Sequence, residues 1–173
     1  MTARPARAVV ALGSNLGDRL LRLREARRAL DALPGVRVRA ASWLYETAPV
    51  GGPPQGDFLN ACLALETTAS PEALLARLHA LETEAGRRRD VVDGPRTLDL
   101  DLILFDDVVR DGPPPTLPHP RFARRAFVLA PLRDLAGEAP SPPDGRTPDA
   151  LWAALTAAER AAVRRLLPPE EWS

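Results

Sequence analysis

The pattern of apolar and polar residues predicts strands that alternate with helices along the chain. Apolar runs and period-two patterns predict strands, whereas leucines and alanines at helical spacing predict helices. Strands are expected at 8–12, 36–46 and 57–67 and in a segment that ends near 109. Helices are expected at 20–33, 71–85 and 127–135, with one or two short ones within 149–167. This order, with two adjacent strands in the middle, favours an α+β fold, a ferredoxin-like α/β sandwich whose mainly antiparallel sheet is flanked by helices.

Capping residues, glycines and prolines mark where these elements begin and end. Ser70 suits an N-cap and Pro71 suits the first position of the helix that follows it. Residues 48–56 are rich in glycine and proline and are expected to form a loop. The proline-rich stretch at 113–120 lacks the backbone donors of a central strand, so it is expected to be extended and stiff. The last segment, 156–173, is expected to be a helical tail.

Two carboxylates stand inside a segment that otherwise has the pattern of a buried strand. Every even-numbered residue from 98 to 104 is leucine, so strand alternation predicts a leucine face. The opposite face is expected to hold Thr97, Asp99, Asp101, Ile103 and Phe105. Two strand steps separate the stems of Asp99 and Asp101 by about 6.6 Å, which lets them share a divalent cation or hold one each of a pair. A solvated strand face is the simpler interpretation, but such apolar flanks make unpaired acids costly to bury, so a cation or an arginine such as Arg96 is expected nearby.

Composition narrows the possible functions. At 173 residues and 18.7 kDa the chain suits one domain, and its 23 basic and 23 acidic residues leave no net charge to attract nucleic acid or a membrane. All 23 basic residues are arginine, which excludes a lysine Schiff base, a Walker-type phosphate lysine and the lysine of protein kinases. The single cysteine, Cys62, lies in an apolar run and cannot form a disulfide within the chain. Since neither a signal peptide nor a membrane span is visible, a soluble cytoplasmic protein is expected.

Two polar segments are candidates for phosphate binding, and each also has a plain structural interpretation. The turn at 13–18 holds two glycines but lacks the spacing and the lysine of a phosphate loop, so helix capping by Asn15 or Asp18 is favoured. The arginines at 87–89 form either a solvated face or, with Arg96, a clamp for a polyphosphate.

Aromatic and imidazole side chains give two more candidates. Phe58 and Asn60 stand at strand spacing after a glycine-rich loop, and an aromatic face beside an amide suits a flat heterocycle, although such a pair is more often ordinary core. His119 is held between prolines, which would fix its ring for a phosphate or nucleotide contact. His79, in the middle of a predicted helix, is better explained by packing or by the surface.

Five short motifs, read in order, closely resemble the 6-hydroxymethyl-7,8-dihydropterin pyrophosphokinases of folate biosynthesis. The motifs are Ala11–Gly17, Glu46–Gly51, Asp57–Asn60, Gly94–Asp101 and Leu117–Pro120. The resemblance covers about 8–155 and implies a single pyrophosphokinase domain over 1–173. The family transfers a diphosphate from ATP to the hydroxymethyl group of the pterin and releases AMP. For this chain it implies ATP as co-substrate, a pair of Mg²⁺ ions, small-molecule substrates only, no nucleic acid or membrane partner, and a monomer.

The resemblance also implies roles for the residues that match the family's motifs. The catalytic arginines would be Arg87 and Arg96, and the metal ligands would be Asp99 and Asp101. The pterin would be stacked between two phenylalanines and bound at its edge, by Thr47, Val50, Phe58, Asn60 and Phe127. ATP would be contacted by Glu82, Arg89, Thr116, His119 and Arg125.

The chain departs from the family pattern at a few positions around these motifs. Asp93 stands where an aromatic residue is common, Pro114 replaces a basic residue, and Ala48 stands where proline is frequent. The loop from 87 to 94 is one residue shorter than the family's. A missing positive charge near the ATP site could be supplied by Arg121 or Arg124.

Two other functions stay open from the residues alone. A nucleotidyltransferase also combines a Gly-Ser turn with an Asp-x-Asp pair, but its turn lies close before the acids, and here two helices and two strands intervene. An RNA-binding module of the same fold could use the arginine loop, but it would need aromatic-rich central strands and a basic surface. Release of AMP from ATP would indicate diphosphate transfer, whereas release of inorganic diphosphate would indicate a nucleotidyltransferase. Salt-dependent RNA binding without ATP turnover would indicate the RNA-binding module.

Overall fold

The computed structural model describes residues 3–87 and 92–173, which are built around a six-stranded sheet. The strands are β1 (Ala6–Ser14), β2 (Val36–Ala41), β3 (Leu44–Thr47), β4 (Phe58–Thr67), β5 (Asp99–Phe105) and β6 (Val163–Leu167). Their order across the sheet is β5-β1-β4-β3-β6, and β2 pairs with the other half of β4. Each of these pairs is antiparallel.

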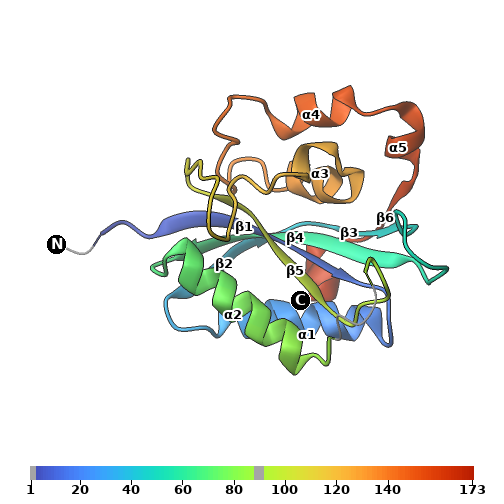
Figure 1. The fold of residues 1–173 in the computed structure, drawn as a ribbon, viewed down its shortest axis with the longest axis horizontal. Coiled ribbons are helices and arrows are strands. Elements are labelled where there is room, and N and C mark those ends of the chain that lie inside the picture. Colours follow the sequence, from blue (N-terminus) through green and yellow to red (C-terminus); the bar gives the residue numbers. More distant parts are fainter. Residues whose placement is uncertain (1–2, 88–91) are drawn as a thin grey trace.

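Helices cover both faces of the sheet (Figure 1). One face carries α1 (Arg19–Asp31) and α2 (Pro71–Glu84), and the other carries α3 (Ala126–Arg133), α4 (Pro148–Ala154) and α5 (Ala157–Ala161). Because β4 lies between β1 and the strands that follow α1, the topology is a split βαβ unit, and the predicted ferredoxin-like sandwich is confirmed. In the part of the chain that the structure describes, no helix is long and apolar enough to cross a membrane.

Local capping sets the helix starts that the sequence predicts. Ser70 Oγ accepts a hydrogen bond from the Ala73 backbone N–H at 3.1 Å, and Pro71 occupies the first turn of α2. Asp18 Oδ1 accepts from the Leu21 N–H at 3.0 Å and so caps α1. The proline-rich stretch at 113–120 forms no central strand, as predicted.

The apolar face of β5 changes side where its pairing with β1 shifts by one residue. The leucines at 98–102 pack in the core under α1 and α2, as predicted. Consecutive residues of β1 pair with Leu102 and Leu104, so Ile103 is the extra residue of a bulge. Leu104 therefore joins Ile103 in the second core, against α3, while Phe105 packs with the leucines. The predicted alternation is correct up to 103 and wrong for the last two residues.

Two predicted strands have different ends in the structure. The segment 36–46 is not one strand, because the chain leaves the sheet at Ser42, whose Oγ accepts the Cys62 backbone N–H at 2.9 Å. The strand that was expected to reach 109 ends at Phe105, because Asp106 turns into the left-handed region with a φ of 44°.

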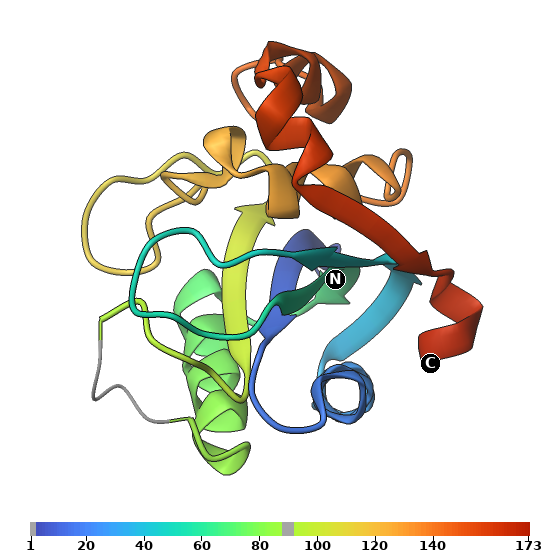
Figure 2. The same cartoon turned by 90° about the vertical axis from the view of Figure 1, so that its right-hand side faces the viewer.

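The largest error concerns the C-terminal segment 156–173, which the composition predicts to be helical throughout. Helix α5 occupies only its first part, and Val163–Leu167 is the strand β6, which pairs with β3 at the sheet edge (Figure 2). Beyond it, Trp172 is fully buried and its Nε1 donates to the Ser42 carbonyl at 2.8 Å. Tertiary pairing therefore outweighs the helical propensity of this alanine- and arginine-rich stretch.

Candidate active site

The predicted pterin and metal residues meet on the α3 face of the sheet. Gly13 of β1 pairs with Asn60 of β4 on one side and with Asp99 of β5 on the other. A Cβ at residue 13 would lie 3.1 Å from Asn60 Oδ1 and 3.6 Å from the Phe58 ring. The missing side chain therefore leaves room in the middle of the sheet for the Asn60 amide and the Phe58 ring.

A cavity of about 430 Å³ opens beside this row, a size that suits a small organic ligand. Its apolar part is formed by Phe58 at the start of β4, by Phe127 in the first turn of α3, and by Val50 of the intervening loop. The remaining predicted residues in its wall are Thr47, Arg96, Asp99 and Arg125. The cavity thus joins an aromatic end to a charged end.

A buried polar pair lies at the aromatic end. Asn60 Nδ2 donates to Thr47 Oγ1 at 2.8 Å, and both residues are about 5% exposed. With the amide nitrogen on Thr47, the Asn60 carbonyl oxygen is directed toward Gly13. At the same cavity, the Arg125 guanidinium lies 5.4 Å from the centroid of the Phe127 ring.

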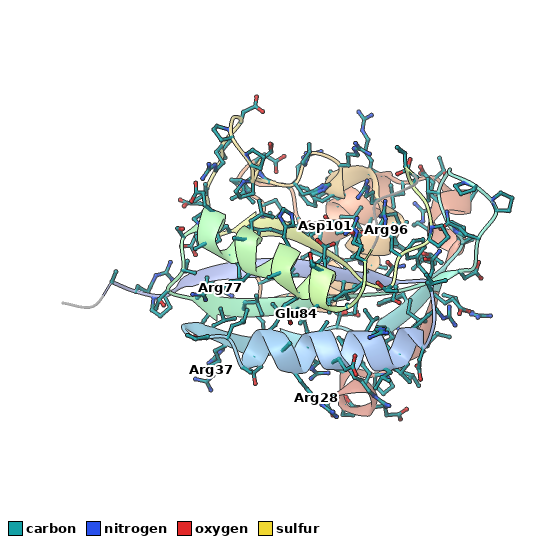
Figure 3. The ribbon with its side chains drawn as sticks, turned by 60° about the horizontal axis from the view of Figure 1, so that its bottom comes forward. Arg28, Arg37, Arg77, Glu84, Arg96 and Asp101 are labelled. Carbon is teal, nitrogen blue, oxygen red and sulfur yellow. The ribbon has the colours of Figure 1, made fainter. Side chains whose placement is uncertain are left out.

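The two aspartates of β5 share this face, as predicted, but differ in their partners. Asp99 accepts from Arg87 Nη1 at 2.7 Å and from Arg96 Nη1 at 3.1 Å. Asp101 has no ion-pair partner within 4.0 Å among the described residues, although Arg96 lies near it (Figure 3). Burial, followed by the charge of Asp99, raises the pKa of Asp101 to about 6. Asp101 is therefore a half-buried carboxylate that makes no ion pair with any residue in the described ranges.

The donor set fits Mg²⁺. Two carboxylates on one strand face, one of them without a partner, are the hard oxygen ligands that this ion prefers. No group of three or more His, Cys, Asp or Glu side chains in the described ranges could hold a metal. Mg²⁺ held here would therefore take its other ligands from water and phosphate oxygens, which is its usual arrangement beside nucleotides.

Glu82 of α2 fixes the position of the Arg87 side chain. Its buried carboxylate forms an ion pair with the Arg87 guanidinium, and its Oε2 accepts the Leu100 backbone N–H at 3.2 Å. Arg87 is thus placed between Glu82 and Asp99. Arg87 Nε and Thr97 Oγ1 are buried without a hydrogen-bond partner among the described residues.

His119 lies next to this charged end. Its backbone N–H donates to the Ile103 carbonyl at 2.9 Å, and its Nδ1 accepts the Arg121 N–H at 3.1 Å. Burial, with the charges of Arg125 and Arg121, lowers the pKa of His119 to about 4. The ring is therefore neutral near pH 7 with its proton on Nε2, which makes it a hydrogen-bond donor for a phosphate or nucleotide.

Comparison with known proteins agrees with this geometry. The model of the 7,8-dihydro-6-hydroxymethylpterin-pyrophosphokinase (HPPK) family matches residues 9–137. This chain belongs to the HPPK family. A 2-amino-4-hydroxy-6-hydroxymethyldihydropteridine pyrophosphokinase of Pseudomonas aeruginosa is 46% identical over 143 residues, which cover 83% of this chain and 85% of the relative. The Bacillus subtilis protein of the same name is 44% identical over 128 residues, which cover 74% of this chain and 77% of that one.

Solved structures support the fold. A Plasmodium falciparum HPPK-DHPS structure matches with a TM-score of 0.68 at 15% identity, over 94% of this chain and 47% of that one. A second HPPK-DHPS structure, in complex with substrates, matches with a TM-score of 0.67 at 11% identity, over 88% of this chain and 43% of that one. The present chain therefore spans less than half the length of these solved chains.

Several residues of this HPPK chain that surround the cavity were not assigned to it from the sequence. Asn15 does not cap α1; its side chain joins two loops, donating from Nδ2 to Gln55 Oε1 and accepting the Arg96 N–H at Oδ1, both at 2.8 Å. Gln55 Nε2 in turn donates to the Asp93 carbonyl at 2.8 Å. Glu159, Ala162 and Val163 of the C-terminal segment also line the wall. Arg121 and Arg124, which the sequence suggested only as replacements for a missing charge near ATP, line it from the two ends of turn η1 (Phe122–Arg124).

Three predicted ATP residues of the HPPK chain lie away from the cavity wall. Thr116 is half-buried, His119 lies beside the wall, and Glu82 lies beneath Arg87. Arg89 lies outside the described residues. Glu82 was predicted as an ATP contact, and its ion pair with Arg87 indicates a supporting role as well.

Proposed function

We propose that this protein transfers a diphosphate from ATP to the hydroxymethyl group of 6-hydroxymethyl-7,8-dihydropterin and releases AMP. The observation that carries the proposal is the cavity, whose aromatic end, backed by the buried Asn60–Thr47 pair, adjoins a charged end that Asp99 lines with several arginines. Asp101 lies behind this wall, on the same face of β5 as Asp99. In the reaction, the hydroxymethyl oxygen bonds to the β-phosphorus, the bond from that phosphorus to the α–β bridging oxygen breaks, and the hydroxyl proton is lost. The product enters tetrahydrofolate biosynthesis.

At the aromatic end, Phe58 and Phe127 would stack on the two faces of the pterin. Asn60 and the backbone around Thr47 and Val50 would bind its edge. Besides its bond to Thr47, the Asn60 amide has a second N–H donor and a carbonyl acceptor. A heterocycle with the wrong pattern would leave these buried groups unpaired, which disfavours it strongly.

At the charged end, Asp99 and Asp101 would hold a pair of Mg²⁺ ions. When bound, such ions neutralise phosphate oxygens and orient the attacking hydroxyl. The raised pKa of Asp101 supports this assignment, because a carboxylate that is costly to ionise alone is stabilised by an adjacent cation.

Arg87 and Arg96 would stabilise the charge that develops on the transferring group. Their guanidinium groups are already preorganised, Arg87 by Glu82 and Asp99 and Arg96 by Asp99, so little reorganisation is needed during the reaction. ATP would be contacted by Glu82, Arg89, Thr116, His119 and Arg125.

The decisive experiment measures AMP release from ATP with Mg²⁺, with and without the reduced hydroxymethylpterin. AMP should form only when both Mg²⁺ and the pterin are present. Inorganic diphosphate as the released product would instead indicate a nucleotidyltransferase. Salt-dependent RNA binding without any ATP turnover would indicate an RNA-binding module.

We further propose that residues 1–173 form one domain that acts as a cytoplasmic monomer on small molecules. Burial of the only cysteine, Cys62, fits a reducing compartment. Packing of Trp172 against the β2–β3 connection fits a single domain. Light scattering and limited proteolysis test these two points, since a dimer mass or a stable shorter fragment would contradict them.

A further inference from the structure

The proposed reaction gives no role to two arginines of the cavity wall, Arg121 and Arg124. Arg121 and Arg124 lie at the ends of turn η1 (Phe122–Arg124), and their side chains line the cavity together with Phe58 and Phe127. Both are exposed, and neither has a carboxylate within 4.0 Å among the described residues. Most other charges in the wall have partners.

The acidic residues of the wall are occupied elsewhere. Asp99 is paired with Arg87 and Arg96, and Asp93 lies 3.7 Å from Arg96. Glu159 accepts the Thr156 N–H at 2.7 Å in a capping box. Glu159 keeps its negative charge in that bond, but Arg121, Arg124 and Arg125 outnumber it, so this part of the described wall has an excess of positive charge that attracts an anion.

The position of these arginines indicates which part of the reactants they face. They line the cavity that holds the aromatic end together with Arg125, the one predicted ATP residue in its described wall, whereas Thr116 and His119 are absent from that wall. The charge of Arg121 nevertheless reaches His119, where it contributes to the lowered pKa. Arg121 and Arg124 thus lie between the pterin end and the nucleotide end.

We propose that Arg121 and Arg124 bind the diphosphate group after its transfer to the pterin, so that they hold the product rather than the substrates. This inference rests on the proposed function. The pterin alcohol carries no charge at its hydroxymethyl group and gains nothing from these arginines. The diphosphate ester is an anion in the same cavity, and guanidinium groups bind phosphate through paired, charge-assisted hydrogen bonds.

The test compares the affinities of three molecules for Arg121→Gln and Arg124→Gln by calorimetry. The probes are the hydroxymethylpterin alcohol, its chemically prepared diphosphate ester, and ATP with Mg²⁺. Each variant should bind the ester about tenfold more weakly, the scale of one lost charge-assisted hydrogen bond, while the affinity for the alcohol stays within twofold. Arg37→Gln is the matched control, because Arg37 lies far from Arg96 and Asp101 (Figure 3) and its loss removes the same charge without changing either affinity.

Three results would overturn the inference. Unchanged affinity for the ester in both variants would show that these arginines do not contact the diphosphate, and equal losses for ester and alcohol would show a structural role. A loss confined to ATP would place them at the nucleotide instead and would also contradict the proposal. Failure of the wild-type protein to form AMP would count against the proposed function, whereas normal AMP formation with unaltered ester binding would count against this inference alone.

Discussion

Replacing Asp101 with asparagine should stabilise the ligand-free protein while it removes most of the activity. Of the two aspartates on β5, Asp101 is the one that lacks an ion-pair partner in the described structure, and its pKa is raised to about 6, mainly by burial and then by the charge of Asp99. Asparagine has nearly the same shape and carries no charge. The substitution therefore removes the electrostatic penalty without creating a void.

The size of this stabilisation, and how it changes with pH, follow from the difference between the pKa of Asp101 in the folded protein and its ordinary value. The ordinary pKa of this carboxyl is 3.8, so the folded protein binds its proton more tightly than the unfolded chain does. Stability from this group is therefore fully present below about pH 4 and is lost as the pH rises through 6. At pH 7 the ionised Asp101 lowers the free energy of unfolding by up to about 3 kcal/mol, and at pH 5 by about half of that.

Urea unfolding followed by tryptophan fluorescence, with EDTA present, measures this effect. Asp101→Asn should exceed the wild type in unfolding free energy by about 3 kcal/mol at pH 7 and by about half as much at pH 5. Asp107→Asn is the matched control, because Asp107 is exposed on the surface just after β5 and its loss should change stability by less than about 0.5 kcal/mol.

The functional part of the same prediction uses the AMP-release assay. Asp101→Asn should lower AMP formation by roughly 100-fold, the scale of removing one electrostatic group from a reaction site. Mg²⁺ with an unreactive ATP analogue should stabilise the wild type more than the variant. An asparagine variant that is less stable at pH 7, or a difference that does not shrink between pH 7 and pH 5, would refute the reasoning.

Three further predictions test the supports of the site. Gly13→Ala should raise the KM for the pterin about tenfold, because its Cβ would press on Asn60; a normal KM in a folded variant would contradict this. Glu82→Gln should lower the free energy of unfolding by about 2 kcal/mol, because Arg87 loses its buried partner, and it should reduce kcat more than it weakens ATP binding. A double-mutant cycle with Arg87→Gln should show strong coupling, and additive effects would argue against a functional Glu82–Arg87 pair. Trp172→Ala should lower the unfolding free energy by about 3–5 kcal/mol in urea, whereas a loss under about 1 kcal/mol would mean that the C-terminal anchor contributes little.

The fold was predictable from the sequence wherever local signals decide it. Ser70 and Asp18 cap their helices through bonds to residues three positions away, so nearby residues are sufficient. Strand β6 is different, because its stability comes from pairing with β3, more than a hundred residues earlier in the chain. The break between β2 and β3 has the same cause, since it depends on the bond between Ser42 and the distant Cys62.

The site was predictable where strand periodicity alone places side chains together. Asp99 and Asp101 share a face because they are two residues apart on one strand. Gly13 could not be assigned, because its role appears only when the register sets it between Asn60 and Asp99. The ion pair of Glu82 with Arg87 likewise depends on how α2 packs beneath β5, which no spacing in the sequence reveals.

The C-terminal segment, where strand β6 was wrongly predicted to be helical, also forms part of the cavity wall. Three arginines of α1 hold the backbone carbonyls of Pro169, Glu171 and Ser173, and one of them, Arg27, also stacks 4.6 Å from the centroid of the Trp172 ring. This anchor fixes β6 against β3, and β3 ends at Thr47, the partner of the pterin-binding amide. A loosened anchor should therefore raise the KM for the pterin before it changes the affinity for ATP. Trp172→Phe keeps an aromatic but smaller ring and loses the hydrogen bond from the indole to Ser42. Measuring both constants for this variant separates the coupling from global unfolding, and equal changes in both constants would exclude it.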